Sequence, residues 1–173
     1  MQDTSQSPSI DPVIFHDTRG MKLDIFRLLG ALCQEAHLDV GDFMFWGRDP
    51  ASGSSILIGV EHKTLRALLS DIKSGRVIHQ LEGMKAVYDR VWLLVDEDLP
   101  WKIDDDGYLT FATGRDIRGH TVWLSTKFLY DAYSNFLVGI QERGFSYKKV
   151  DGARESAMAV RALYSYYQQP PSG

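Results

Sequence analysis

Residues 91–97, VWLLVDE, form a nearly continuous apolar run with no polar alternation. A strand of this kind is buried on both faces, so it belongs at the centre of a sheet that helices cover on each side. The flanking sequence fits, with strands predicted at 13–17, 39–47, 56–63 and 145–150, and helices at 21–36, 65–74, 76–90, 124–142 and 153–167. We therefore predict an α/β fold, a three-layer sandwich with a central mixed sheet flanked by helices.

Local signals set several boundaries. The Gly, Pro and Ser-rich stretch 48–55 is a turn, so 39–47 and 56–63 should pair as an antiparallel hairpin. Thr64 is the expected N-cap of the next helix and Gly75 its expected stop.

A chain of 173 residues is of the usual length for a single domain. We expect a disordered tail at 1–12, one domain at 13–167 and a second tail at 168–173. The polar stretch 98–120 is interpreted as an insertion that carries a hairpin around 101–111.

Composition excludes several classes of protein. No apolar run approaches the roughly 18 residues that a membrane span requires, and residues 1–12 lack a secretory signal. Cys33 is the only cysteine, which excludes an intrachain disulfide and a cysteine-based zinc site, and its apolar surroundings predict a core thiol. These features favour a cytoplasmic protein of a bacterial or phage-infected cell, with no membrane partner.

The formal net charge of −4 argues against a general nucleic-acid coat protein. It does not argue against a nuclease, because a metal-dependent active site itself concentrates carboxylates. Residues 62–90 hold six Lys or Arg against three acids. This segment, which includes Arg66, is the predicted DNA-contacting surface.

One group of residues suggests chemistry: Asp42 on one strand of the predicted hairpin, and Glu61 and Lys63 on the other. Side chains alternate along a strand, so Glu61 and Lys63 share a face while His62 points away. Carboxylates are hard ligands for Mg²⁺ or Mn²⁺, and an ammonium group can stabilise a phosphorane-like transition state. On spacing alone, a surface hairpin with a salt bridge explains the same residues.

Several motifs then occur in order: VGDF at 40–43, VEHK at 60–63, LLSDIKSGR at 68–76, HQLEGM at 79–84 and YDRVWLLVDE at 88–97. From Asp39 to Glu97 the chain closely resembles the XPF-type nuclease domain, the excision-repair cross-complementing group 4 family of the restriction-endonuclease-like superfamily. HDTRG at 16–20 is similar to the family's early motif, which extends a weaker resemblance over 13–167.

The resemblance assigns roles to individual residues. It implies that Asp42 and Glu61 are ligands of Mg²⁺ or Mn²⁺ and that Lys63 is the catalytic lysine. It implies further that Asp17 adds a metal ligand, and that Arg19, Arg76 and Gln80 support the site or contact DNA.

Three positions depart from the family pattern: His62 replaces an arginine, Ala67 an aspartate and Gly20 a glutamate. Two carboxylates are thereby lost. The resemblance implies a metal-dependent endonuclease of branched, flapped or nicked DNA, in repair or recombination. We expect a stand-alone bacterial or phage-like member that works as a homodimer or with another DNA-processing protein. The alternative is a catalytically inactive DNA-binding or scaffolding subunit, and the choice between DNA and RNA stays open.

Overall fold

The computed structural model describes residues 14–19 and 23–170. Within these residues a six-stranded sheet has the order β2-β1-β3-β4-β5-β9. Its strands are β1 (Ile14–Asp17), β2 (Cys33–Ala36), β3 (Phe43–Arg48), β4 (Ser55–Thr64), β5 (Arg90–Asp96) and β9 (Ser146–Val150). The helices are α1 (Leu23–Leu29), a 3₁₀ turn η1 (Gly30–Leu32), α2 (Leu65–Ser74), α3 (Arg76–Lys85), α4 (Tyr130–Glu142) and α5 (Gly152–Tyr167).

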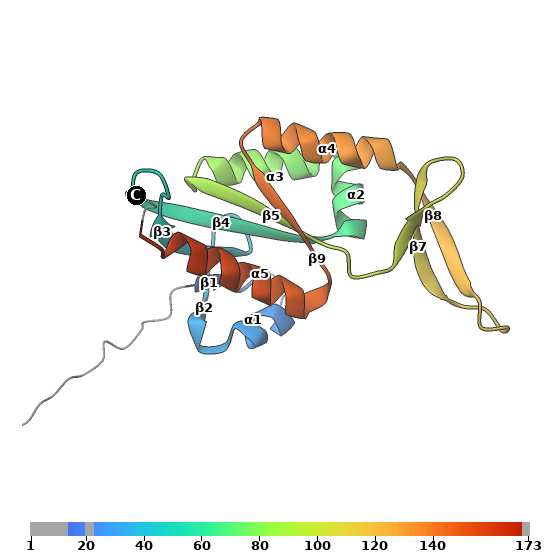
Figure 1. The fold of residues 1–173 in the computed structure, drawn as a ribbon, viewed down its shortest axis with the longest axis horizontal. Helices are drawn as coiled ribbons and strands as arrows, with labels where there is room; N and C mark the ends of the chain where they lie inside the picture. The colour runs from blue at the N-terminus through green and yellow to red at the C-terminus, as the bar shows by residue number, and fades with distance from the viewer. Residues whose placement is uncertain (1–13, 20–22, 171–173) are drawn as a thin grey trace, which may run out of the picture.

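The sheet is mixed. Strand β4 pairs antiparallel with β3 and parallel with β5, and β5 in turn pairs parallel with β9. Helices α2, α3 and α4 cover one face, while α1 and α5 cover the other (Figure 1). A separate apolar core fills each interface, one around Leu81, Leu93 and Tyr133 and one around Phe45, Ile58 and Val160. The predicted three-layer α/β sandwich with a central mixed sheet is confirmed (Figure 1).

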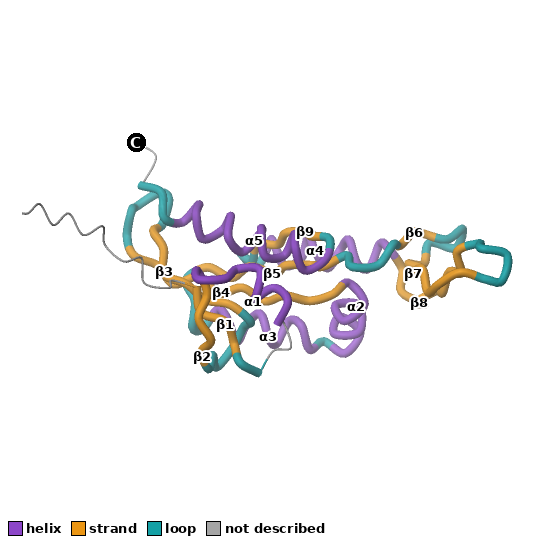
Figure 2. The backbone as a smooth tube through the Cα atoms, turned by 90° about the horizontal axis from the view of Figure 1, so that it is seen from below, coloured by secondary structure: helices purple, strands orange, loops and turns teal. Residues whose placement is uncertain are grey.

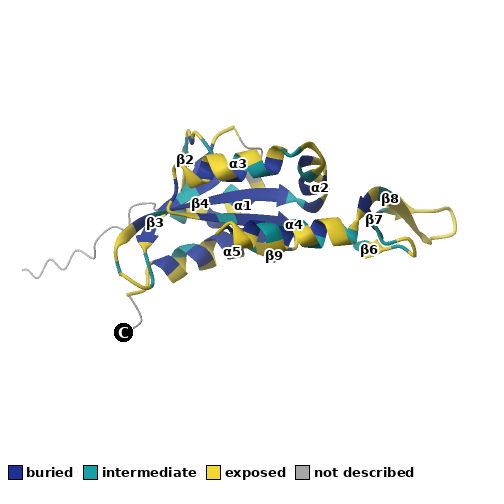
Figure 3. Cartoon of the chain, turned by 90° about the horizontal axis from the view of Figure 1, so that it is seen from above, coloured by how far each residue is buried: buried dark blue, intermediate teal, exposed yellow. Residues whose placement is uncertain are grey.

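The central strands owe their position to their composition. Most residues of β4 and β5 are buried, as expected for strands covered on both faces (Figure 3). Between them, α2 begins at the predicted N-cap, since the Thr64 hydroxyl accepts a hydrogen bond from the Ala67 amide at 3.3 Å. It ends at the predicted stop, Gly75, whose φ of 76° is left-handed.

A second sheet projects from one end of the molecule, beyond α2 (Figures 1 and 2). It has the order β6-β7-β8, with β6 (Trp101–Ile103), β7 (Tyr108–Arg115) and β8 (Thr121–Leu129) all antiparallel. We call residues 101–129 the β-arm. The predicted hairpin of 101–111 is confirmed. The helix predicted at 124–142 is wrong in its first six residues, which pair with β7 instead, for example Leu124 opposite Phe111.

Two other helix predictions were too long. In the predicted helix 21–36, α1 ends before Gly30, which takes a φ of 58°, and residues 33–36 form β2 beside β1. The predicted helix 76–90 stops at Lys85, because the chain must turn to deliver Tyr88 to the core and Arg90 to β5. The 1–12 tail lies outside the described residues.

Cys33 is buried in the core, as predicted. Its burial raises the pKa of the thiol to about 12, so the reactive thiolate is disfavoured. No helix in the described ranges is both long and apolar enough to cross a membrane.

Candidate active site

Four carboxylates line one cavity of about 230 Å³: Asp17, Asp39, Asp42 and Glu61. Asp17 ends β1, Asp42 immediately precedes β3, and Glu61 lies within β4. Gln80 from α3 and the side chain of Arg19 also line this cavity, which we call the acidic cavity. Five of the residues singled out from the sequence are thus brought together.

Asp42 does not lie on a strand, as we had predicted. Residues 39–42 form a loop before β3, because Gly41 takes a φ of 83° and a Cβ there would approach the Met84 methyl group to 2.9 Å. The loop is tied down by the Tyr88 hydroxyl, which donates a hydrogen bond to the Val40 carbonyl at 2.7 Å. The backbone of Asp42 bridges the sheet, since its amide donates to Val60 and its carbonyl accepts from Asp17, both at 2.9 Å.

The side chains of the two aspartates are held by hydrogen bonds. Asp42 Oδ2 accepts from the His62 amide at 2.8 Å. Asp17 accepts from the Leu38 amide at 3.2 Å and forms a 3.1 Å ion pair with Arg19 Nε. Burial acts to raise the pKa of Asp17, but these bonds outweigh it and leave the pKa below its ordinary value. Asp17 is therefore ionised at neutral pH.

Lys63 lies behind the cavity rather than in its lining. Its ammonium group is buried between two carboxylates, 3.2 Å from Glu61 Oε1 and 2.8 Å from Asp71 Oδ2. Burial acts to lower the pKa of Lys63, but the hydrogen bond to Asp71 and the charge of Glu61 outweigh it and raise the pKa. The amine stays protonated. Arg76 Nε lies 3.7 Å from the other oxygen of Asp71.

Asp71 was missed by the sequence analysis. It lies four residues after Ala67, the position where the family pattern has its aspartate, and so on the same side of α2 one turn further along. In this chain, the carboxylate from α2 that pairs with Lys63 is that of Asp71. That i+4 relation was visible in the sequence. Tyr88 was also missed, and nothing in its local pattern marked it.

Two predicted residues lie elsewhere. His62 faces the opposite side of the sheet, as the alternation of β4 predicted, with Nε2 3.1 Å from both Asp96 Oδ2 and Ser156 Oγ. Arg66 does not line the acidic cavity but faces the β-arm, with its guanidinium 5.5 Å from the centre of the Phe111 ring. Gly20 lies outside the described residues.

The donor chemistry of the acidic cavity suits Mg²⁺ or Mn²⁺. Carboxylate oxygens are hard ligands, and Gln80 adds a buried Oε1 with no hydrogen-bond partner among the described residues. In the part of the chain that the structure describes, no group of three or more Asp, Glu, His or Cys is already arranged around an ion position. Mg²⁺ is commonly held by only one or two carboxylates together with water and substrate phosphate, so Asp42 and Glu61 fit that mode.

The family is decided by a match to the family model of the ERCC4 domain, which covers residues 10–135 of this chain. The chain belongs to the ERCC4 domain family. The resemblance to an XPF-type nuclease domain is confirmed. Among curated proteins, none matches the chain.

Solved structures show the same fold. XPF from Aeropyrum pernix superposes with a TM-score of 0.56 at 17% identity, over 88% of this chain and 63% of that one. The same protein in complex with DNA gives a TM-score of 0.57 at 15% identity, over 90% of this chain and 64% of that one. This ERCC4 domain thus spans less than two thirds of either structure.

Proposed function

We propose that this chain is a metal-dependent DNA endonuclease that hydrolyses phosphodiester bonds. The observation that carries the proposal is the shared lining of the acidic cavity, where Asp17, Asp42, Glu61 and Gln80 lie beside a buried, protonated Lys63. Membership of the ERCC4 domain family supports the same reaction class.

Asp42 and Glu61 would hold the divalent ion, with the Gln80 carboxamide oxygen close by in the same lining. When bound, the ion would neutralise charge on the attacked phosphate and lower the pKa of a coordinated water. Asp17 already accepts from Arg19 Nε and the Leu38 amide, which takes up part of its capacity to bind an ion. Asp17 is therefore less essential than Asp42 and Glu61.

The chain's own residues have defined tasks. Lys63 is held by Glu61 and Asp71, so its positive charge is fixed beside the cavity without reorganisation, which is the condition for effective transition-state stabilisation. Arg76 has a side chain 66% exposed and is anchored to Asp71, which suits it to pair with a phosphate of the substrate.

DNA is the proposed substrate. Helices α2 and α3 carry four of the cations of residues 62–90, and a phosphate backbone would approach the acidic cavity along these helices; the four are Arg66, Lys73, Arg76 and Lys85. A related structure is described as XPF from Aeropyrum pernix in complex with DNA.

The test is cleavage of end-labelled duplex, flap and four-way-junction DNA by the pure protein in Mg²⁺, Mn²⁺ or EDTA. Metal-dependent cleavage should disappear in Asp42→Asn and Glu61→Gln while DNA binding is retained. Glu35→Gln, at an exposed position of β2, is the matched control and should cleave like wild type. Equal behaviour of wild type and both site variants on every substrate would instead support a non-catalytic DNA-binding subunit.

A further inference from the structure

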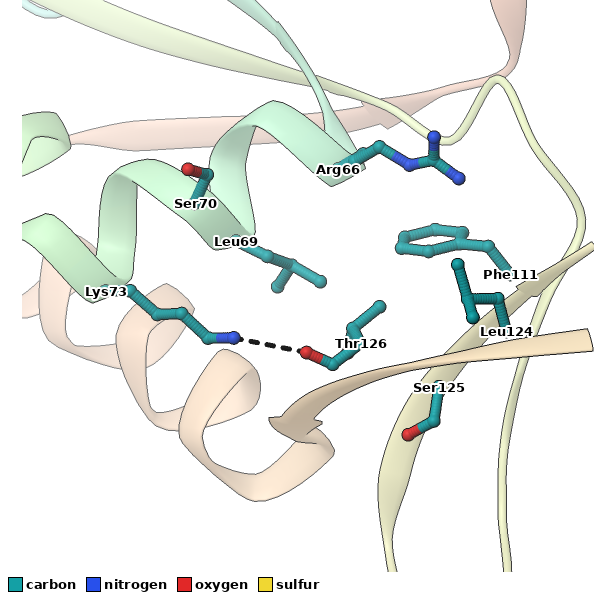
Figure 4. Close-up of a pocket in the computed structure, with 8 residues that line it drawn as sticks. All are labelled: Arg66, Leu69, Ser70, Lys73, Phe111, Leu124, Ser125 and Thr126. Carbon is teal, nitrogen blue, oxygen red and sulfur yellow. Dashed lines mark hydrogen bonds between the residues drawn. The ribbon is translucent and has the colours of Figure 1, made fainter. Parts of the chain in front are cut away.

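A second cavity, of about 370 Å³, lies between α2 and the β-arm (Figure 4). Helix α2 contributes Arg66, Leu69 and Lys73, and the β-arm contributes Phe111, Leu124 and Thr126. Its volume falls within the range of small-ligand sites, roughly 300–1,000 Å³. The described residues that line this arm cavity include none of those lining the acidic cavity.

The lining of the arm cavity combines cations with an apolar wall. Its eight described lining residues include two cations and no carboxylate. Lys73 Nζ donates one hydrogen bond, to the Thr126 carbonyl at 3.1 Å, and Arg66 extends over the Phe111 ring. Leu124 is 60% exposed and forms an open apolar wall. A ligand that matches this lining carries a negative charge and a flat apolar part.

Helix α2 connects the two cavities. Its Asp71 points to Lys63 behind the acidic cavity, whereas Arg66 and Lys73 point to the β-arm. Arg76 lies at the junction of α2 and α3, paired with Asp71. A polyanion bound at the acidic cavity can therefore continue along the cations of α2 to the arm cavity.

We infer that the arm cavity binds an unpaired nucleotide of the DNA strand, with the two phosphates that flank it on Arg66 and Lys73 and its base against Leu124. A nucleotide offers both parts, and only an unpaired base has a face free to pack on protein. This inference deepens the proposed function, on which it rests for the choice of DNA, by naming single-stranded DNA as the part of the substrate held beside the β-arm.

A cavity on the other face of the sheet serves as a control for the arm cavity. A cavity of about 330 Å³ between α1 and α5 is lined by Arg154 and Arg161, with Met158, 61% exposed, on its wall. It thus resembles the arm cavity in size, cations and apolar exposure. However, α1 and α5 cover the opposite face of the sheet from α2 and α3 (Figure 1), so a strand at the acidic cavity cannot reach it directly.

The experiment measures fluorescence anisotropy of a short fluorescein-labelled oligothymidylate, with the full chain in EDTA over a range of salt. The double variant Arg66→Ala/Lys73→Ala should raise Kd about tenfold at low salt and reduce the salt slope by about 1.4, the value for two lost phosphate contacts on a single strand. Arg154→Ala/Arg161→Ala should bind like wild type.

The apolar wall is tested separately. Leu124→Asp should raise Kd at least about fivefold, since base packing is lost and a like charge is introduced. Met158→Asp is its control. Both side chains are more than half exposed, so neither change disturbs the core, which thermal melts verify.

The inference is overturned if either arm-cavity variant binds oligothymidylate like its control. It is also overturned if affinity for a blunt duplex falls as much as affinity for oligothymidylate, because that would indicate a general backbone contact. EDTA removes cleavage from the assay, so binding and cleavage are tested independently. If the arm-cavity variants selectively lose single-strand binding but the wild-type chain never cleaves DNA, this inference stands and the endonuclease proposal fails.

Discussion

The two faces of β4 each carry a cluster of buried acidic and basic groups. On the α2 and α3 face, Lys63 lies between Glu61 and Asp71 beside the acidic cavity. On the α5 face, His62 lies between Asp96 and Ser156, and all three are at most 5% exposed. The residue types are similar, but Glu61 of the first cluster, which we call the open cluster, lines the acidic cavity. The second, which we call the sealed cluster, is buried between the strands and α5. Access to solvent, rather than composition, separates the candidate site from a structural network.

The sealed cluster has a clear mechanical role. Asp96 Oδ2 faces His62 on β4 and Ser156 on α5, while Asp96 Oδ1 accepts from the Gly152 amide at 2.7 Å at the start of α5. One carboxylate therefore ties two strands and a helix together.

The largest expected effect concerns the open cluster. Glu61→Gln should lower the cleavage rate by about 10²–10³-fold, the size of losing a preorganised electrostatic contact. It should leave stability within about 1 kcal/mol, because the amide still accepts from Lys63. Single-turnover cleavage and urea unfolding measure the two quantities. A large loss of stability with unchanged cleavage would instead give Glu61 a structural role.

Asp96→Ala should show the opposite profile. Removing the shared acceptor leaves buried donors unpaired, which costs about 3 kcal/mol of unfolding free energy. The cleavage rate, measured well below the melting temperature, should change less than about threefold, or about 0.7 kcal/mol. Urea denaturation monitored by tryptophan fluorescence checks the first value. A rate loss as large as that of Glu61→Gln would show that the sealed cluster takes part in the reaction.

Asp71→Asn sharpens the comparison within the open cluster. It should slow cleavage about tenfold, or about 1.4 kcal/mol, because Lys63 loses a charged partner. Asp71 raises the pKa of Lys63, so the variant should also lose activity at lower alkaline pH than wild type. Adding Ala67→Asp to Asp71→Asn should restore part of the rate if a carboxylate one helical turn earlier can pair with Lys63. A pH profile of unchanged shape would assign Asp71 a packing role only.

The smallest expected effect is acid sensitivity at Asp17. Its folded pKa lies below the ordinary value of 3.8, so its contribution to stability is complete above that pH and is lost as pH falls through the lower folded value. Asp17→Asn should therefore flatten the loss of stability below pH 3.8, by no more than about 1 kcal/mol because Arg19 is half exposed. Urea midpoints measured against pH, with Asp24→Asn as an exposed control, test this.

The sequence predicted most of what the central strands determine. The apolar run of β5 and the alternation of β4 gave the sandwich and placed Glu61, Lys63 and His62 on their correct faces. Prediction failed where tertiary pairing decides conformation. Residues 124–129 have apolar spacing compatible with a helix, and only their pairing with β7 makes them a strand. The packing of Tyr88 against Gly59 is likewise not predictable from local sequence; a Cβ on Gly59 would lie 2.2 Å from the Tyr88 ring.

The site followed the same division. Asp42, Glu61 and Lys63 were found because motif order and strand alternation are local properties. Asp71 was missed, although a helix repeats its face every three to four residues and Asp71 therefore lies on the same side of α2 as Ala67. The arm cavity was beyond reach, since its two halves are distant in sequence and meet only in the folded chain.

The junction of the β-arm with α4 has a mechanical consequence. Strand β8 passes into α4 without an intervening loop, the Tyr130 amide donates to the Gly107 carbonyl at 2.9 Å, and Trp101 stacks on Tyr130. The β-arm is therefore fixed at its base to a core helix. A force on its far end, near exposed Ile117, would be transmitted to α4 through this junction.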